Sequence, residues 1–124
     1  PWMSGGGCLT ARDFLRMGLL FARKGWGVGN RQVGSPSFLE KTIKNLGPKY
    51  MKLSKNKYLY YSNSTMVTEN MIGHSGYGGQ FLATNFKTGK VAAFFSVLET
   101  KSATKESYKT DMINMLTNLV NDNS

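Results

Sequence analysis

The one histidine of the chain lies in a run of small residues that could hold a ligand against the backbone. The run Ile72-Gly73-His74-Ser75-Gly76-Tyr77-Gly78-Gly79-Gln80-Phe81 contains an imidazole, a serine hydroxyl group, a tyrosine hydroxyl group and four glycines. Glycine lets another group approach the backbone closely, and glycines beside a strand can present N–H groups to a bound ligand. A glycine-rich turn with a surface histidine would account for the same residues without any function. The local composition leaves both interpretations open.

Two segments of the chain resemble one enzyme superfamily. His74-Ser75-Gly76, with Tyr77-Gly78-Gly79-Gln80-Phe81 after it, resembles the third active-site motif of the serine β-lactamase and penicillin-binding-protein superfamily. The resemblance is to the class C, esterase and D-aminopeptidase branch, and in the esterases and peptidases of that branch His-Ser-Gly or His-Thr-Gly often replaces Lys-Thr-Gly. Residues 3–13 resemble the segment that opens a helix in the all-helical half of the fold. The order and approximate spacing of the two segments also match the family.

The resemblance implies a serine acyl-transfer hydrolase with His74, Ser75, Gly76 and Tyr77 in its site. Such an enzyme stabilises an oxyanion with N–H donors, each worth about 10²–10³ in rate, and the backbone N–H of Tyr77 would be one donor. Gly76 would leave room for substrate, and Ser75 would offer a hydroxyl group. His74 stands where the family usually has lysine and would act on the substrate carboxylate in a pH-dependent way. This replacement favours an esterase or D-amino-acid peptidase over a β-lactamase.

Two further motifs of the family precede the part that this chain resembles. The S-x-x-K motif contains the nucleophilic serine and its lysine, and the Y-x-N motif contains a tyrosine. The interpretation assigns no Ser-x-x-Lys of this chain to that motif. It therefore predicts the C-terminal portion of a longer hydrolase, which opens at Pro1 without an initiator methionine and is inactive by itself. Tyr61-Ser62-Asn63 and Lys87-Thr88-Gly89 imitate Y-x-N and K-T-G, but their positions make them chance matches.

Charge offers a different class of function. The 124 residues, about one domain, carry a formal net charge of +9, and residues 1–57 hold eleven Lys or Arg against two acids. A basic half can bind nucleic acid, an anionic envelope polymer or a membrane surface, or it can be a solvated face. Nucleic acid is disfavoured because no reader motif accompanies the lysines. Tyr58, Tyr60 and Tyr61 form either a base-stacking platform or, as we prefer, part of a half-buried strand.

Metal, disulfide and cofactor chemistry find little support. Cys8 is the single cysteine and His74 the single histidine, so we expect no internal disulfide, no metal site and no cofactor. Cys8 is interpreted as a small residue packed beside a helix start rather than as a nucleophile. No apolar run approaches the length of a transmembrane helix. The compartment is open, although the resemblance favours a periplasmic, secreted or cell-envelope location.

Two helices are expected in the first part of the chain. Thr10 and Asp13 predict a capping box, with Leu9 and Phe14 as a hydrophobic staple, for a helix that ends by Gly25. A second helix should begin after Ser35 with Pro36 in its first turn, and Gly47-Pro48 should stop it. Its inward-facing residues should be Phe38, Leu39, Ile43 and Leu46.

Strands dominate the second part. Residues 49–68 are ambiguous, with a strand-like stretch at 58–61 and a turn at 62–64. Residues 80–86 and 91–98 predict a hairpin closed by residues 87–90, and the second strand, apolar almost throughout, should be buried on both faces. A terminal helix capped by Thr104 should then cover the sheet. Its inward-facing residues should be Tyr108, Met112, Met115, Leu116 and Leu119.

The expected fold is α+β, the C-terminal part of a β-lactamase-like fold. It has antiparallel strands under a C-terminal covering helix, together with a helical segment. Residues 1–57 would belong to the helical subdomain and residues 58–124 to the α/β subdomain. The partners would be a small-molecule, peptide or ester substrate and the upstream part of the same catalytic domain. A non-catalytic binding or assembly protein of this fold, and a basic nucleic-acid-binding domain, are the alternatives.

Overall fold

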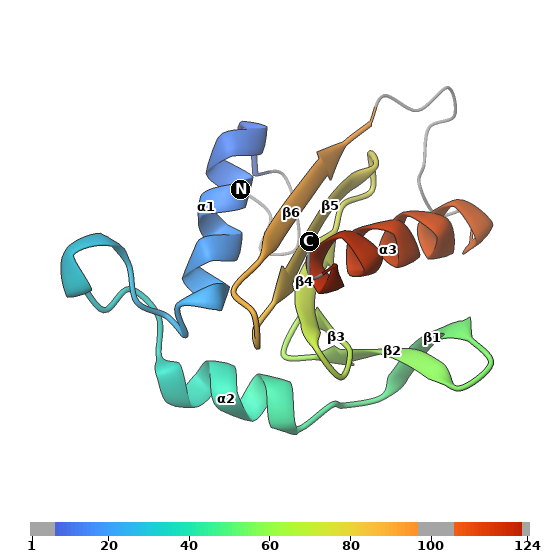
Figure 1. The fold of residues 1–124 in the computed structure, drawn as a ribbon, viewed down its shortest axis with the longest axis horizontal. Coiled ribbons are helices and arrows are strands. Elements are labelled where there is room, and N and C mark those ends of the chain that lie inside the picture. The colour runs from blue at the N-terminus through green and yellow to red at the C-terminus, as the bar shows by residue number, and fades with distance from the viewer. Residues whose placement is uncertain (1–6, 97–105, 123–124) are drawn as a thin grey trace.

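The chain runs from helices into a sheet and back into a helix. A computed structural model describes residues 7–96 and 106–122 (Figure 1). The helical elements are α1 (Ala11–Ala22), the short 3₁₀ helix η1 (Val28–Asn30), α2 (Pro36–Lys44) and α3 (Glu106–Asn121). The strands are β1 (Lys49–Ser54), β2 (Lys57–Ser62), β3 (Thr65–Val67), β4 (Met71–Ser75), β5 (Gln80–Asn85) and β6 (Val91–Phe95). The predicted α+β class is confirmed, and the division at residue 57 stays a prediction.

The six strands form one antiparallel meander in which each strand pairs with the next along the chain. The expected turn after β2 is present, because Asn63 and Ser64 take positive φ values of 47° and 61° as a two-residue hairpin turn requires. The hairpin of β5 and β6 is also present, and the Asn85 side-chain oxygen accepts hydrogen bonds from the Lys87 and Thr88 backbone N–H groups. The sequence did not predict β1, whose residues are mostly exposed.

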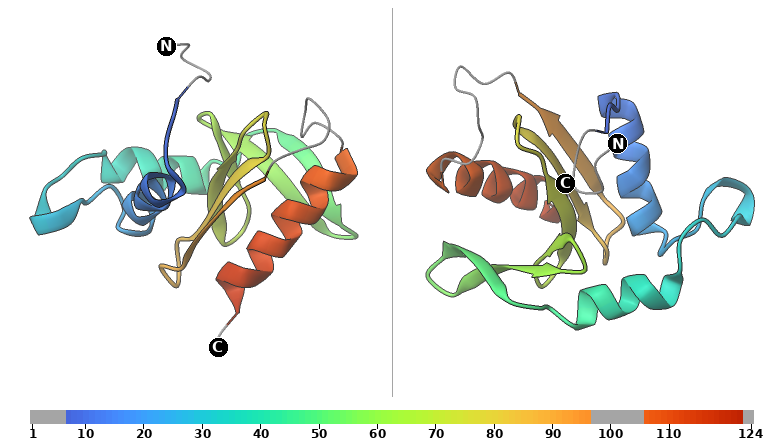
Figure 2. Two further views of the ribbon diagram at one scale, coloured as in Figure 1. Left: turned by 90° about the horizontal axis from the view of Figure 1, so that it is seen from above. Right: turned by 180° about the vertical axis from the view of Figure 1, so that it is seen from behind.

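Strand β5 is the centre of the structure because helices cover both of its faces. On one face, Phe81 and Ala83 pack in a core with the α3 residues Ile113, Leu116 and Val120. On the other face, the Thr84 hydroxyl donates to the Gly18 carbonyl oxygen of α1 at 3.2 Å. Figure 2 shows α1, in blue, and α3, in red, on opposite sides of β5 and β6. A Cβ at Gly18 would collide with the Val91 and Leu82 side chains, so glycine lets α1 approach the sheet this closely.

The expectation that residues 91–98 are buried on both faces is wrong for the part the structure describes. Strand β6 covers Val91–Phe95, its residues are half-buried, and Phe95 is exposed. The strand forms one edge of the sheet, so within residues 7–96 and 106–122 one row of its backbone groups has no neighbouring strand. Strand β5, in contrast, is buried from Phe81 to Asn85. The position of a strand in the sheet decides how far it is buried, and composition does not reveal that position.

Helix α1 begins and ends within the expected limits. Thr10 accepts a hydrogen bond from the Asp13 backbone N–H and donates its hydroxyl to the Asp13 carboxylate at 2.8 Å. In a standard capping box the Asp13 side chain would accept a hydrogen bond from the Thr10 backbone N–H. Here it accepts one from the Thr10 hydroxyl instead. Both this hydrogen bond and the Arg16 guanidinium lower the pKa of Asp13. The carboxylate is thus favoured at the positive end of the helix dipole.

Helix α2 has the predicted start, and of the predicted inward residues Leu39, Ile43 and Leu46 are half-buried. Ser35 caps it by accepting from the Phe38 N–H, and Pro36 occupies the first turn. Phe38 is 53% exposed, whereas Thr42 is buried. The Thr42 hydroxyl accepts a hydrogen bond from the Asn63 side chain at 2.9 Å, which joins the helix to the β2–β3 turn. The helix ends at Lys44 with Asn45 as its cap, before the expected Gly47-Pro48 stop.

Helix α3 packs on the sheet through part of its predicted face, with Leu116 in the core as expected. The buried stripe is Ile113, Leu116 and Val120, with Tyr108 and Met112 partly buried against the same core. The predicted inward residues Met115 and Leu119 are exposed, Leu119 to 55%. Two overlapping apolar stripes exist on this helix, and the sheet covers only one of them. The predicted cap Thr104 lies outside the described residues.

This stripe makes a measurable prediction. Ile113→Ala removes a side chain that is 1% exposed and should lower the free energy of unfolding by about 2–5 kcal/mol. Leu119→Ala, on the exposed face of the same helix, should change it by less than about 0.5 kcal/mol. Urea unfolding followed by circular dichroism measures both values. A larger effect for Leu119→Ala than for Ile113→Ala would contradict the observed orientation of α3.

Candidate active site

His74 lies on β4 against helix α1. Its Cα pairs with that of Leu82 on β5, so its side chain shares the face of the sheet that α1 covers. The Phe21 ring of α1 lies 5.8 Å from the imidazole, centroid to centroid. This burial lowers the pKa of His74 below its ordinary value of 6.5. His74 is therefore neutral at pH 7 and offers hydrogen bonding in place of positive charge.

The glycines after His74 form a tight turn that joins β4 to β5. The Gly79 N–H donates to the Gly76 carbonyl oxygen at 3.2 Å, and the Gly76 N–H donates to the Gln80 carbonyl oxygen at 2.7 Å. A Cβ at Gly78 would lie only 2.8 Å from the Gln80 side-chain nitrogen, and one at Gly76 would also collide with that side chain. The Gln80 side chain therefore packs closely on both glycines and would have to move if either carried a side chain. Among the described residues, the Tyr77 backbone N–H has no hydrogen-bond acceptor.

A pocket of about 750 Å³, the His74 pocket, opens beside this turn. Five consecutive residues, from His74 to Gly78, line one side of it. Gly7, Cys8, Leu9 and Phe14, from the segment that leads into α1, line another side. Gln80 and Phe95 complete the wall, and the Phe95 ring lies 5.5 Å from that of Phe14. All four predicted site residues, His74, Ser75, Gly76 and Tyr77, therefore lie on one pocket.

The structure changes the interpretation of several other residues. Cys8 is exposed on the pocket, so the expectation that it packs beside the helix start is wrong. Sequence reasoning did not assign Phe95 to the site, because its strand was interpreted as core. The edge position of β6 brings Phe95 to the pocket, and nothing in the local sequence signals that position.

The short motifs outside the pocket have structural explanations. In Tyr61-Ser62-Asn63, Ser62 donates its hydroxyl to the Asn45 carbonyl oxygen at 2.6 Å and holds the end of α2 against β2. Lys87-Thr88-Gly89 forms the β5–β6 turn, where Gly89 has a positive φ of 78°. Our sequence interpretation overlooked two Ser-x-x-Lys patterns. One, Ser54 to Lys57, closes the β1–β2 hairpin, and both residues are exposed; the other, residues 102–105, lies outside the described residues.

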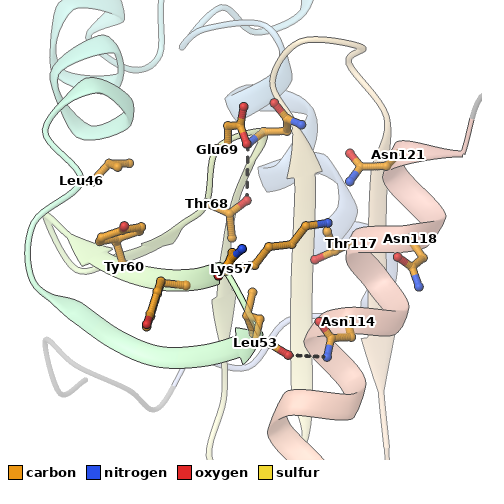
Figure 3. A pocket seen from close by; sticks show the side chains of 13 residues that line it. Leu46, Leu53, Lys57, Tyr60, Thr68, Glu69, Asn114, Thr117, Asn118 and Asn121 are labelled. Atoms are coloured by element: carbon orange, nitrogen blue, oxygen red, sulfur yellow. Dashed lines mark hydrogen bonds between the residues drawn. The ribbon is translucent and has the colours of Figure 1, made fainter.

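A second hollow, of about 270 Å³, lies between the β1–β2 hairpin, the β3–β4 connection and α3 (Figure 3). None of its lining residues lines the His74 pocket. It is rich in side-chain amides, and Asn114 donates to the Leu53 carbonyl oxygen at 3.4 Å. The side-chain oxygen of Asn70 is buried and has no hydrogen-bond partner in the part of the chain that the structure describes. One ordered water would satisfy this oxygen, so the hollow does not by itself indicate a function.

Three negative findings bear on the function of this pocket. Within residues 7–96 and 106–122, no three His, Cys, Asp or Glu side chains gather into a metal-binding group. None of the helices in these ranges combines the length and apolarity needed to cross a bilayer. No protein-family model, curated protein or solved structure matches the chain. The geometry of the pocket is therefore the main structural indication of a function.

The burial of His74 predicts a pH effect. Because its pKa is lower in the folded than in the unfolded protein, its contribution to stability is complete above about pH 6.5 and is lost as the pH falls through the folded pKa. The single imidazole resonance in an NMR titration should report a pKa below 6.5. His74→Gln should reduce the loss of unfolding free energy between about pH 7.5 and about pH 5. A pKa at or above 6.5 would contradict the burial of the ring.

Proposed function

We propose that this chain supplies the third-motif wall of the active site in a β-lactamase-related serine hydrolase. The observation that supports it most is the meeting of the two resembling segments on one pocket. Gly7, Cys8 and Leu9 come from the first segment, and the residues from His74 to Gly78 belong to the second. They are separated by more than sixty residues of sequence. If the resemblance of either segment were a coincidence, the two segments would have no reason to line the same pocket.

In this proposal the β4–β5 turn stabilises the oxyanion. The Tyr77 N–H, which has no acceptor among the described residues, is one of the two donors that a tetrahedral intermediate needs. The turn is held by the hydrogen bonds of Gly76 and Gly79, so the donor keeps its direction before substrate arrives. Such preorganisation is what makes a donor effective in the transition state. The nucleophilic serine and its lysine come from residues outside these 124.

The state of His74 favours neutral substrates. Burial lowers the pKa of the imidazole, so the ring is uncharged at pH 7 and cannot attract a substrate carboxylate as a lysine would. A neutral imidazole can still donate or accept a hydrogen bond near the reacting carbonyl group. We therefore favour an ester, or a peptide whose acyl group carries no recognised carboxylate, over a β-lactam antibiotic. Ser75 and Gly76 line the same edge of the pocket.

Covalent labelling tests this function. A serine-reactive fluorophosphonate should add one label to the gene product that includes the upstream residues and none to residues 1–124 alone, as intact mass measures. In the longer protein, His74→Ala should lower ester turnover by about 10²-fold or more, and His74→Asn, which keeps a neutral hydrogen-bonding group, should lower it less. Lys55→Ala, in the exposed β1–β2 turn, is the control. No label on either protein would contradict the proposal.

Exposed tyrosines support a second candidate, the binding of single-stranded nucleic acid. The rings of Tyr50 and Tyr61, which are 52% and 43% exposed, lie 5.6 Å apart on neighbouring strands. The Lys109 ammonium lies over the Tyr50 ring and also donates to its hydroxyl. Exposed aromatic rings beside cations are the usual platform for stacked bases.

The prediction for this second candidate is a salt-dependent affinity for an oligothymidine, measured by fluorescence anisotropy. Tyr50→Ala should weaken binding by about 1–3 kcal/mol, because one stacked base loses its partner. Tyr77→Ala removes an even more exposed tyrosine, from the His74 pocket, and should have no effect. Equal losses in the two variants, or no binding at low salt, would exclude this function.

A further inference from the structure

The strongly basic first half of the chain is not explained by the His74 pocket. A third pocket, of about 540 Å³, lies between the end of α1, helix α2 and the β5–β6 turn. Figure 1 shows that turn directed toward α2. The volume lies within the range of about 300–1,000 Å³ that is usual for small-molecule sites. None of the residues that line this pocket lines the His74 pocket or the amide-rich hollow.

The wall of this pocket is both apolar and cationic. Its apolar part consists of Phe21 from α1, Leu39 and Ile43 from α2, and Phe86 from the β5–β6 turn. These side chains are half-buried, so part of each faces the open space. A surface of this kind gains free energy when an apolar chain covers it and displaces water.

Three lysines come to the pocket from three different elements. Lys24 follows α1, Lys44 ends α2 and Lys87 lies in the β5–β6 turn. One carboxylate, that of Glu40, faces them and lies 2.6 Å from the Lys44 ammonium. The hydrogen bond and charge of Lys44 lower the pKa of Glu40, and the charge of Lys24 contributes, so Glu40 is ionised at pH 7. Three cations and one anion leave an excess of positive charge that attracts an anion.

Lys24 is held in a backbone conformation that favours glycine. Its φ is 53°, at the position just beyond the cap of α1. The Lys24 N–H donates to Phe21, and the Gly25 N–H donates to Leu20, the hydrogen-bond pattern of a Schellman motif. Glycine is the usual residue there, because a Cβ makes this conformation unfavourable. A residue kept in an unfavourable conformation is a reason to look for a role of its side chain.

We propose that this pocket binds a small anionic amphiphile, a molecule with one alkyl chain and a terminal phosphate or carboxylate group. The anionic group lies among the ammonium groups of Lys24, Lys44 and Lys87. The alkyl chain covers the apolar wall that Phe21, Leu39, Ile43 and Phe86 form. An inorganic anion would leave that wall in water, and an uncharged alcohol would leave the excess positive charge uncompensated. Both parts of the ligand are therefore needed for tight binding.

Calorimetric titration with dodecyl phosphate, below its critical micelle concentration, tests the proposal. Residues 1–124 should bind one molecule per chain, and methyl phosphate and dodecanol should bind at least about tenfold more weakly. Lys24→Gly should weaken dodecyl phosphate binding by about tenfold or more, because one charged hydrogen-bonding group is lost. Its melting temperature should equal or exceed that of the wild type, because glycine suits the left-handed conformation.

A matched variant distinguishes the pocket from general surface charge. Lys55→Gly removes the same charge from the exposed β1–β2 turn and should change the affinity by less than about twofold. Lys87→Gln provides an independent test within the pocket and leaves the backbone hydrogen bonds of the β5–β6 turn in place. It should weaken binding as Lys24→Gly does, and this holds even if Lys24→Gly fails to fold.

Several results would overturn the proposal. Equal loss of affinity in the Lys55→Gly and Lys87→Gln variants would show diffuse attraction to the basic surface. Binding of methyl phosphate as tight as that of dodecyl phosphate would exclude a role for the apolar wall. Binding to vesicles of anionic phospholipid without binding to monomeric dodecyl phosphate would show a membrane surface contact in place of a pocket. No binding of dodecyl phosphate at all would exclude the site directly.

Discussion

Burial of β5 on both faces is the constraint on which the rest of the structure depends. Phe81 and Ala83 face α3, while Leu82 and Thr84 face α1, so one six-residue strand joins two helices that are far apart in sequence. Each large side chain that is fully buried there contributes about 1.5–3 kcal/mol relative to an exposed position. Asn85 ends the strand by donating to α3 and accepting from the β5–β6 turn. Its polar atoms are thus satisfied although the residue is buried.

The close approach of α1 to the sheet determines the chemistry of the histidine. Gly18 removes the side chain that would keep the helix away from Leu82 and Val91. One helical turn later, Phe21 comes to lie on the imidazole of His74. The ring loses water and its pKa falls. Packing within the fold therefore shifts His74 further toward its neutral form.

Phe21 also connects the two pockets for which we propose ligands. Its ring contacts His74 on one side and lines the lysine-rich pocket on the other. The excess positive charge of the first half of the chain is partly gathered at that pocket, because α1 and α2 end near the β5–β6 turn. The remaining basic residues are spread over the surface, where they favour solubility. The His74 pocket and the cationic pocket thus use different residues of the same framework.

Local patterns in the sequence determined the elements with strong start and stop signals. Thr10 with Asp13 and Ser35 with Pro36 predicted the two helix starts, and the apolar runs around residues 87–90 predicted the hairpin. These features depend on neighbours within four or five residues, so the sequence contains them fully. The sequence also singled out His74-Ser75-Gly76-Tyr77, because glycines around a lone histidine are visible without a fold.

Only the tertiary structure decided which face of a helix is buried and which strand lies at the edge of the sheet. Helix α3 has two overlapping apolar stripes, and the position of β5 selects Ile113, Leu116 and Val120 over Met115 and Leu119. Strand β6 is apolar but lies at the edge, so it is half-buried and brings Phe95 to the pocket. Lys24, Lys44 and Lys87 have no relation in sequence, yet they surround one pocket. Such juxtapositions depend on contacts between residues far apart in the chain, and local periodicity contains no record of them.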